Sequence, residues 1–414
     1  MGSKDKGIVE EVNNIDRGGK RREIINLAVL FVMFFIYALV FTIAGFYDFY
    51  NIQYPLAGPV NFCLLAVMVL NNVDLISAVR RRDKELIILT ALIIITGLNL
   101  VIVGSGKGAF FVPVNFLLIW YVSNKLYISP KGLKVLACVY MAFLLFYLFI
   151  AYPRLFTTFE NYKYNTNTAA TFTIYTLLCA FVLLEMLYDK SKVIGLFMVT
   201  LLLKGFQLSL WHRARGAFIM LILFMVFRYV IPKKWWDIKP LYVLLCLLAT
   251  LGSLLFVSMY VAVGATGANF KMPFFYKEVF SGRERIWYEL FTKLVNKERP
   301  YMLFTGIGTN FELESFFEKN VHNAMYNFLV IHGIIVLAGI LYFIYKRLWG
   351  LRKNITGSRA AFCAMCVIMA VFFESYFDVD LIWADYALNL IFLLAVTHGC
   401  ERSPDGYKEG RQAV

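Results

Sequence analysis

Charged residues are scarce in this sequence: they make up 16% of its 414 residues, and no polar stretch is long enough to form a separate soluble domain. No Walker-type phosphate loop is present, which disfavours an ATP-driven pump. No aspartate-rich motif of the kind that holds a metal-bound nucleotide sugar occurs in the segments expected to be cytoplasmic. The composition therefore places the chain among membrane proteins and disfavours nucleotide-driven chemistry.

Cysteines in a position to bind a metal are also lacking. All seven lie in or beside apolar runs, and none is in the one long polar loop where a disulfide or a metal site could form. Cys363 and Cys366 form a C-x-x-C pair inside a predicted membrane span, where we expect them to pack as small apolar side chains. The sequence therefore predicts neither a metal nor a cofactor.

Long apolar runs are what the sequence has in abundance, with 60% apolar residues and a mean hydropathy of +0.67. A helix needs ~20 apolar residues to cross ~30 Å of hydrocarbon. We therefore expect an all-α polytopic membrane protein in which the whole chain, 1–414, forms a single transmembrane domain. About 12 transmembrane helices are predicted, at about 25–45, 55–73, 86–103, 109–124, 135–152, 168–188, 193–211, 217–232, 241–265, 325–345, 360–375 and 381–397.

The positions of lysine and arginine predict the orientation of these helices. With the N-terminus in the cytoplasm, every short cytoplasmic loop is basic, which satisfies the positive-inside rule. Both termini are then cytoplasmic. Residues 1–24 lead into the first span as an anchor, because no small-residue cleavage site follows them. This topology accounts for most of the net charge of +14, so we expect contact with the lipid bilayer and not with nucleic acid.

Two external features are not explained by topology. One is the large loop 266–324, between the ninth and tenth spans. The other is the short turn 212–216, which places Arg213 and Arg215 at the external membrane surface. Lysine and arginine are normally concentrated on the cytoplasmic side, so topology does not explain these external arginines.

The loop 266–324 contains a predicted amphipathic helix. Ser281 and Glu284 have the spacing of a capping box, and apolar residues follow on one face at helical spacing. The pattern predicts an interfacial helix of about fifteen residues that lies on the outer leaflet. Arg283 stands in its first turn, where unpaired backbone amides favour an anion, and Arg285 follows as a further candidate contact. The alternative is an ordinary interfacial helix whose arginines touch lipid phosphates.

A polar stripe is predicted beside the turn 212–216. If the seventh span continued as a helix, Lys204, Trp211 and Arg215 would share one face. Lys204 would lie ~10 Å below the external surface by helical rise, and a cation at that depth usually marks a buried pathway or site. The stripe would suit a pyrophosphate attached to a lipid, whereas a snorkelling lysine is the alternative.

Further candidate residues lie at the end of the loop 266–324. Gly306 and Gly308 belong to a Gly-Ile-Gly sequence that lacks the preceding strand of a nucleotide loop. His322 and Asn323 enter the tenth span from the external side. An imidazole there could take a proton from an attacking hydroxyl or donate to a phosphate oxygen, although a lone histidine at a helix start is more often a capping or packing residue.

Acidic residues gather at the external ends of the last two spans: Glu374, Asp378, Asp380 and Asp385. They could balance the arginines electrostatically, orient His322 or bind sugar hydroxyls. Solvated loop acids are the alternative for all of them except Asp385, which should lie within the span.

These residues, in this order, resemble the O-antigen ligase and polymerase family of bacterial membrane glycosyltransferases, which implies a GT-C-like fold. One departure is Ala214, where the family often has serine. The resemblance covers roughly residues 200–345 in motifs and the whole chain in topology. It rests on Arg215-Gly216-Ala217, Ser281-Gly282-Arg283 with Ile286-Trp287, Gly306 with Gly308, and His322-Asn323.

The resemblance implies a sugar chain on undecaprenyl pyrophosphate as donor, bound on the side of the cytoplasmic membrane that faces the periplasm or the cell exterior. Arg215 and Arg283 would clamp the pyrophosphate, and His322 would act as a base or a phosphate contact. An acceptor hydroxyl would displace the lipid pyrophosphate in an inverting, metal-independent reaction. We expect the remaining substrate contacts to come from Arg213, Arg285, Lys204, Trp211, Gly306, Gly308, Asn323 and Asp385.

Several functions are compatible with these residues. We favour a polymerase of lipid-linked repeat units, working with other polysaccharide-assembly proteins, because nothing points to a dedicated second acceptor. A ligase, which passes the chain to another acceptor, uses the same donor. A flippase of lipid-linked saccharide also fits the number of spans, but the two halves show no repeat and the polar residues concentrate on one face. The motif pattern of the peptidoglycan glycosyltransferases of the shape and division family fits less well.

Overall fold

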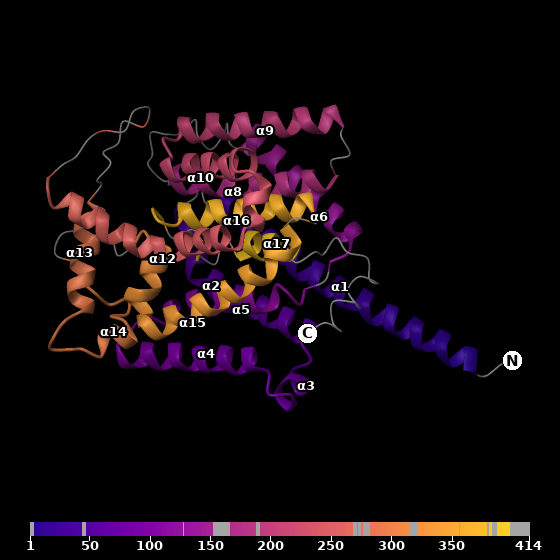
Figure 1. Cartoon of the computed structure of the whole chain (residues 1–414), viewed down its shortest axis with the longest axis horizontal. Coiled ribbons are helices and arrows are strands. Elements are labelled where there is room, and N and C mark those ends of the chain that lie inside the picture. Colours follow the sequence, from indigo (N-terminus) through magenta and orange to yellow (C-terminus); the bar gives the residue numbers. More distant parts are fainter. Residues whose placement is uncertain are drawn as a thin grey trace.

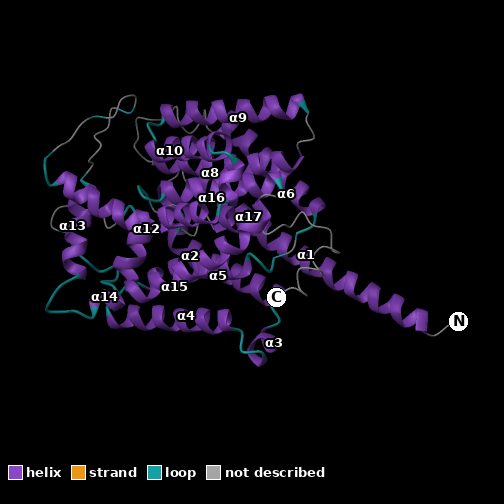
Figure 2. Cartoon of the chain, in the orientation of Figure 1, coloured by secondary structure: helices purple, strands orange, loops and turns teal. Residues whose placement is uncertain are grey.

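The apolar runs of the sequence form helices throughout the part of the chain that the computed structural model describes (Figure 1). Within that part the regular structure is helical, without β-strands (Figure 2). The described residues are 4–43, 47–126, 128–151, 166–187, 191–267, 271, 275, 282–313, 321–355, 357–378, 381–382 and 387–397.

A helix covers each run that was expected to span the membrane, wholly or in part. In chain order the helices are α1 (Lys4–Ile43), α2 (Tyr47–Asn72), α3 (Leu75–Arg80), α4 (Lys84–Ile102), α5 (Phe111–Val122), α6 (Pro130–Phe146), α8 (Thr166–Leu187), α9 (Lys192–Trp211), α10 (Arg215–Met225), α11 (Lys233–Asp237), α12 (Lys239–Gly264), α13 (Arg283–Leu294), α14 (Met302–Thr305), α15 (Ala324–Ile355), α16 (Arg359–Glu374) and α17 (Ala387–Thr397). Short 3-10 or π-helical turns precede α5 and follow α6 and α10.

Five helices of the described residues are long and apolar enough to cross a membrane: Lys84–Ile102, Lys131–Ile150, Lys192–Trp211, Lys239–Gly264 and Ala324–Arg352. Large apolar side chains point away from the bundle on these helices, such as Val101 at 80% exposure and Leu255 at 64%. Such faces are stable in lipid and costly in water. The chain is therefore a helical membrane protein, while the number of about 12 spans and their orientation stay predictions.

The shorter helices are shielded by their neighbours. Every residue of α5 from Pro113 to Val122 is buried, and so is nearly all of α16. α16 lies at the centre of the bundle, in contact with α8, α10, α12, α15 and α17. Cys363 and Cys366 belong to this buried helix, as their predicted packing role requires.

The bundle has two polar ends, which are named here by the helices at them (Figure 1). The α3 end contains α3, the starts of α4, α12 and α16, and the last turn of α15. The α13 end contains α13 and α14, the ends of α4, α9 and α12, and the starts of α10 and α15. Of the segments predicted to be external, the described residues 104–108, 212–216, 282–313, 321–323 and 376–378 belong to the α13 end.

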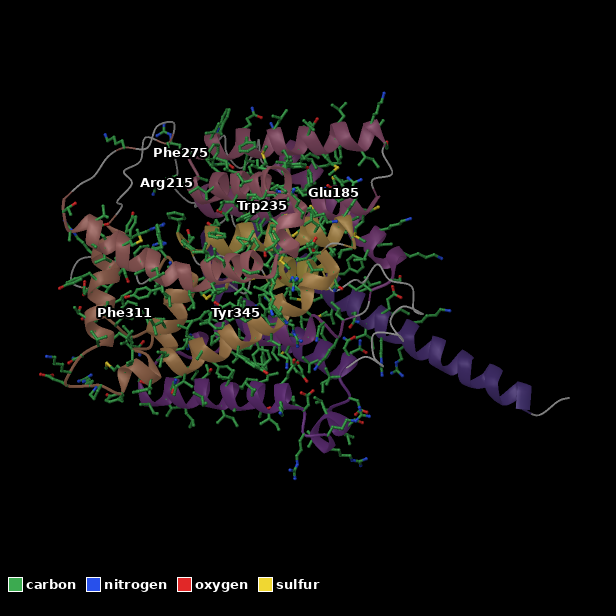
Figure 3. The ribbon with its side chains drawn as sticks, in the orientation of Figure 1. Glu185, Arg215, Trp235, Phe275, Phe311 and Tyr345 are labelled. Carbon is green, nitrogen blue, oxygen red and sulfur yellow. The ribbon has the colours of Figure 1, made fainter. Side chains whose placement is uncertain are left out.

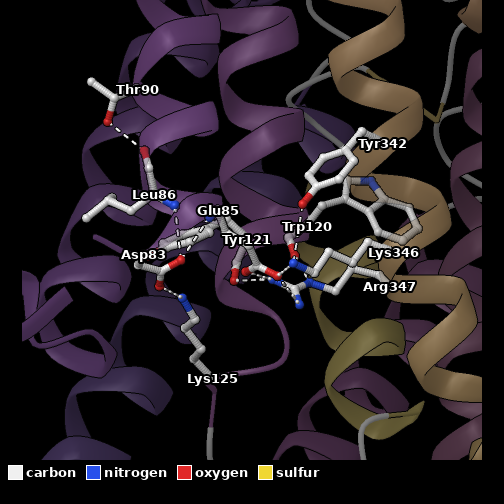
Figure 4. A network of polar contacts seen from close by, with 10 residues as sticks. All are labelled: Asp83, Glu85, Leu86, Thr90, Trp120, Tyr121, Lys125, Tyr342, Lys346 and Arg347. Carbon is white, nitrogen blue, oxygen red and sulfur yellow. Dashed lines mark hydrogen bonds and ion pairs between the residues drawn. The ribbon is translucent and has the colours of Figure 1, made fainter. Parts of the chain in front are cut away.

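An ion-pair network around the buried residues Glu85 and Arg347 holds the α3 end together (Figure 4). The Arg347 Nη2 lies 2.8 Å from Glu85 Oε2, and Lys346 Nζ lies 2.8 Å from Glu85 Oε1. The Arg347 Nε also donates to the carbonyl of Trp120 at 2.7 Å, and Nη2 to that of Tyr121 at 3.3 Å. Arg347 thus satisfies both the Glu85 carboxylate and the unpaired carbonyls at the end of α5.

A second buried carboxylate at the α3 end is neutralised in the same way. Glu185 of α8 accepts from the Arg228 Nη2 at 2.7 Å and pairs with the Arg359 Nη2 at 3.0 Å. Three helical segments are therefore joined through one carboxylate whose charge is compensated.

At the α13 end, the tenth predicted span is broken at Gly333. This residue has φ 82° and ψ 172°, a conformation that only glycine adopts readily. The break leaves carbonyls of the preceding turn without helical partners. The amides of Ile307 and Gly308 donate to the carbonyls of Val330 and Ile331, at 2.8 and 3.2 Å. Residues 307 and 308 of the loop 266–324 thus supply hydrogen bonds that the helix gives up.

This docking of the loop onto α15 explains the Gly-Ile-Gly sequence. A Cβ at Gly306 would lie 2.2 Å from the Ile331 carbonyl oxygen, and one at Gly308 would lie 2.7 Å from a methyl of Val103. Both glycines also have positive φ, 79° and 70°. Asn99 of α4 completes the arrangement, because its Nδ2 donates to the carbonyl of His332 at 3.0 Å. Gly306 and Gly308 therefore serve close backbone packing.

Candidate functional site

The starts of α10, α13 and α15 converge at the α13 end. The first residues of α10 and α13 are Arg215 and Arg283, and neither helix has a side-chain hydrogen bond at its N-cap. The N-terminus of a helix carries partial positive charge and free amide donors. Convergence of such ends, two of them beginning with arginine, creates a region suited to bind an anion.

Buried hydrogen bonds position α13 against the start of α15. The Trp287 Nε1 donates to the carbonyl of Val321 at 2.6 Å, and the Tyr326 hydroxyl donates to the carbonyl of Trp287 at 2.8 Å. The amide of Ala324 donates to the carbonyl of Ser375 at 3.1 Å, which joins α15 to the end of α16. Residues far apart in the sequence are thus fixed side by side.

Asn323 uses its side chain to hold this junction. Its Oδ1 accepts from the Ser253 hydroxyl at 2.8 Å and from the Tyr326 amide at 2.9 Å, while its Nδ2 donates to the Tyr376 carbonyl at 3.0 Å. The side chain is completely buried. Asn323 therefore positions the neighbouring His322, and whether it also contacts a substrate stays a prediction.

The two arginines predicted to clamp a pyrophosphate lie within electrostatic reach of each other. Burial and the positive charge of Arg283 lower the pKa of the Arg215 guanidinium, which stands at the start of α10 after the turn (Figure 3). Arg283 donates from Nη1 to the Phe377 carbonyl. Like charges held close together in a half-buried place repel, so a bound anion would relieve the repulsion.

His322 and Asp378 form a pair beside these arginines. The imidazole Nδ1 lies 3.6 Å from Asp378 Oδ1. His322 has φ +52°, a conformation that is uncommon for residues other than glycine and that often marks functional positions. The prediction that an acidic residue orients His322 therefore has a structural counterpart in Asp378.

Glu374, at the end of α16, is the most deeply buried acid of the site. Its side chain has no measurable exposure, and neither carboxyl oxygen has a hydrogen-bond partner among the described residues. A Cβ at Gly216 would lie 2.5 Å from its Oε1, so the carboxyl packs directly on the first turn of α10. Arg283 and Asp378 both act on it electrostatically. This acid is therefore not the solvated loop residue that was the alternative.

The predicted stripe from Lys204 to Arg215 does not form. Helix α9 ends at Trp211, and the chain reverses through His212–Ala214, so Arg215 begins a different helix. Lys204 instead donates to Gln207 Oε1 at 2.9 Å, and Trp211 is 65% exposed. The expectation of a continued helix is wrong, because Arg213 adopts φ +52° and turns the chain. Whether Lys204, Trp211 and Arg213 contact a substrate stays a prediction.

The amphipathic helix exists but differs from its prediction at the cap. Its N-cap is Gly282 with φ 86°, and not Ser281, which lies outside the described residues. Asp380 and Asp385 also lie outside them. Arg285, on the second position of α13, is exposed.

The apolar face of α13 is also used differently from the prediction. Ile286, Trp287, Leu290 and Leu294 are buried and pack against α12 and α15, while Phe291 remains 51% exposed. Most of the face that was expected to lie on the outer leaflet therefore anchors the helix to its own bundle. This anchoring fixes the place of Arg283.

His212 is a buried residue at the α13 end that the sequence did not single out. Burial lowers its pKa to about 4, so it is a neutral imidazole near pH 7. No local pattern distinguishes it from an exposed turn histidine, because its burial depends on the reversal of the chain between α9 and α10.

In comparisons with known proteins, no family model matches the chain and no curated protein matches it. The described residues contain no group of three histidine, cysteine, aspartate or glutamate side chains placed to hold a metal ion. The features that bear on function are those of the α13 end: two arginines at helix N-termini, a histidine–aspartate pair and a buried acid in a helical membrane protein.

Proposed function

We propose that this protein is a membrane glycosyltransferase that polymerises oligosaccharide repeat units carried on undecaprenyl pyrophosphate. The observation that supports this most directly is the approach of Arg215 and Arg283, each at the start of a helix. A diphosphate is the anion that best matches two guanidinium forks and two helix N-termini. The lipid-facing surfaces of the bundle suit the polyprenyl tail of such a donor.

The reaction would be displacement at the anomeric carbon of the donor sugar. An acceptor hydroxyl oxygen forms the new bond to this carbon as the bond to the pyrophosphate oxygen breaks, and the electron pair leaves with the pyrophosphate. Arg215 and Arg283 stabilise the departing negative charge. The hydroxyl proton passes to His322, whose Nδ1 lies on the side of Asp378. One displacement of this kind inverts the configuration at the sugar.

The charge distribution supports an external location for the site. The α3 end carries the basic residues of the segments predicted to be cytoplasmic, among them Arg228, Lys346 and Arg347. The α13 end then faces the periplasm or the cell exterior. A lipid-linked repeat unit presented on that side would reach the arginines from the outer leaflet.

The test is an assay of the purified protein in detergent with a lipid-pyrophosphate-linked oligosaccharide as the only sugar source. We expect longer lipid-linked chains and free undecaprenyl pyrophosphate, both lost in Arg283→Ala. Arg299→Ala is the matched control, because Arg299 is exposed in the same external loop. Transfer only after addition of a foreign acceptor would indicate a ligase. Movement of the lipid across vesicles without turnover would indicate a flippase and contradict the proposal.

A further inference from the structure

Glu374 is a buried acid at the candidate site that the reaction described above does not use. Both of its carboxyl oxygens lack a hydrogen-bond partner among the described residues. The carboxyl faces the first turn of α10, where a Cβ at Gly216 would lie 2.5 Å from its Oε1. This helix of eleven residues begins without a side-chain cap. An unsatisfied polar group is thus aimed at a helix start that is itself suited to an anion.

The charged and titratable groups around this carboxyl come from every element that meets there. Arg283 of α13 attracts a negative charge on it, whereas Asp378, which follows α16, repels one. His322, which precedes α15, lies next to Asp378, with its Nδ1 3.6 Å from Asp378 Oδ1. On α10 the neighbouring charge is Arg215, which also interacts with Tyr260 of α12. Arg283 gives its Nη1 hydrogen bond to a backbone carbonyl and none to this carboxyl.

Burial without hydrogen bonds disfavours the ionised form of this acid. An ionised carboxylate removed from water costs several kcal/mol unless it is paired and hydrogen-bonded. The two other deeply buried glutamates discussed above, Glu85 and Glu185, each have a cation within 2.8 Å, and Glu374 has no such contact among the described residues. The neutral acid, with one O–H donor, is therefore the form that fits this place.

We infer that Glu374 works as an uncharged carboxylic acid that donates a hydrogen bond to a phosphate oxygen bound at the start of α10. This inference rests on the proposed function, because the ligand is the diphosphate of its donor. Gly216 has no side chain that would separate the carboxyl from a phosphate held by the backbone amides there. A neutral acid is a donor to an anion, as in oxyanion holes built with a protonated aspartate, whereas an ionised one would repel it.

Because the hydrogen bond needs the carboxyl proton of Glu374, binding of the diphosphate should depend on pH. A rise in pH ionises Glu374 and converts the donor into a repelling charge, so binding of a diphosphate should weaken on the alkaline side. Glutamine keeps an N–H donor of nearly the same shape and cannot ionise. Leucine fills the space but removes the donor. The pair of substitutions therefore separates hydrogen bonding from charge.

The experiment measures binding of a short-chain polyprenyl-diphosphate-linked sugar to the purified protein in detergent by calorimetry, at neutral and alkaline pH. The phosphates of this diester do not titrate in that range. We expect Glu374→Gln to bind within about twofold of wild type at neutral pH and to keep its affinity at alkaline pH, where wild type weakens. Glu374→Leu should bind about tenfold more weakly. Glu298→Gln is the control, because Glu298 is an exposed acid of the loop 266–324.

Other outcomes would overturn the inference, the proposed function or both. Binding that tightens about tenfold in Glu374→Gln would mean that the native residue is a charged competitor of the phosphate. Wild-type binding in Glu374→Leu would mean that no contact exists. Binding as expected without any glycosyl transfer would refute the proposed function and leave the phosphate contact standing. No binding to the wild type would refute both.

Discussion

The α3 end and the α13 end differ in whether their buried carboxyl groups are paired with cations. At the α3 end, Glu85 and Glu185 each meet two cationic side chains at ion-pair distance. At the α13 end, Glu374 is buried without a hydrogen bond among the described residues, although arginines stand nearby. Carboxylates that are paired with cations in this way join helices, and they have no unpaired charge with which to bind a ligand. A carboxyl group without partners, near two arginines that repel each other, is what a site that receives an anion requires.

The largest effect should come from breaking the network of the α3 end. Arg347→Met leaves Glu85 with only Lys346 and removes the donors to the end of α5, so we expect a loss of about 3–5 kcal/mol in the free energy of unfolding. Thermal unfolding in detergent measures it. The double variant Arg347→Met with Glu85→Leu should recover much of the loss. Unchanged stability in the single variant would show that the network is dispensable.

Substitution of the arginines at the α13 end should have the reverse effect from Arg347→Met: turnover should fall and stability should stay nearly unchanged. We expect Arg215→Ala and Arg283→Ala each to lower turnover by about a hundredfold or more, since each removes stabilisation of the departing pyrophosphate. Their melting temperatures should stay near that of the wild type, because the side chains are only partly buried. Normal polymer output from either variant would contradict the clamp. Turnover per folded molecule in Arg347→Met should be retained.

Gly306→Ala should change both the local stability of the loop and the turnover. A methyl group there would meet the Ile331 carbonyl in a backbone conformation reserved for glycine, at a cost of about 1–3 kcal/mol. We expect the loop to detach from α15, so that hydrogen exchange increases at Ile307 and Gly308 and turnover falls. Gly350→Ala, on α15 where a Cβ would meet nothing, is the control. Exchange that remains slow in Gly306→Ala would refute the docking.

The smallest expected effect is the change of melting temperature with pH. Burial lowers the pKa of His212 to about 4, whereas an unfolded histidine titrates near ~6.5. As pH falls through this window the unfolded state takes up a proton that the folded state does not, so stability declines. We expect the melting temperature of the wild type to drop by a few degrees there, and less in His212→Gln. An equal drop in both would assign the acid sensitivity to other groups.

The positions of the helices could be predicted from the sequence, because a long apolar run in lipid must satisfy its own backbone hydrogen bonds. The placement of Arg215, Arg283 and His322 at the same end of the bundle could be predicted as well. All three follow or precede external ends of predicted spans, and topology alone brings such ends to one side of the bundle.

The remaining features depend on contacts between distant segments. The reversal at Arg213, the burial of one face of α13 and the break at Gly333 each require a partner that lies far away in the sequence. Gly333 stands in an apolar stretch that reads as an uninterrupted span. The hydrogen bonds that make the break tolerable come from Ile307 and Gly308. The burial of Glu374 likewise depends on the absence of a side chain at Gly216.

The break in α15 constrains the order in which the protein can be assembled. Until residues 304–308 pack against it, a newly inserted tenth span would keep its own helical bonds through Gly333. The unwound form is stable only when residues 304–308, which precede the span in the chain, have folded back onto it and donate to its free carbonyls. We therefore expect the helix to unwind late, as a consequence of the docking of this loop segment onto it. Cross-linking of cysteines introduced at Phe304 and Ile334 during synthesis would time that step.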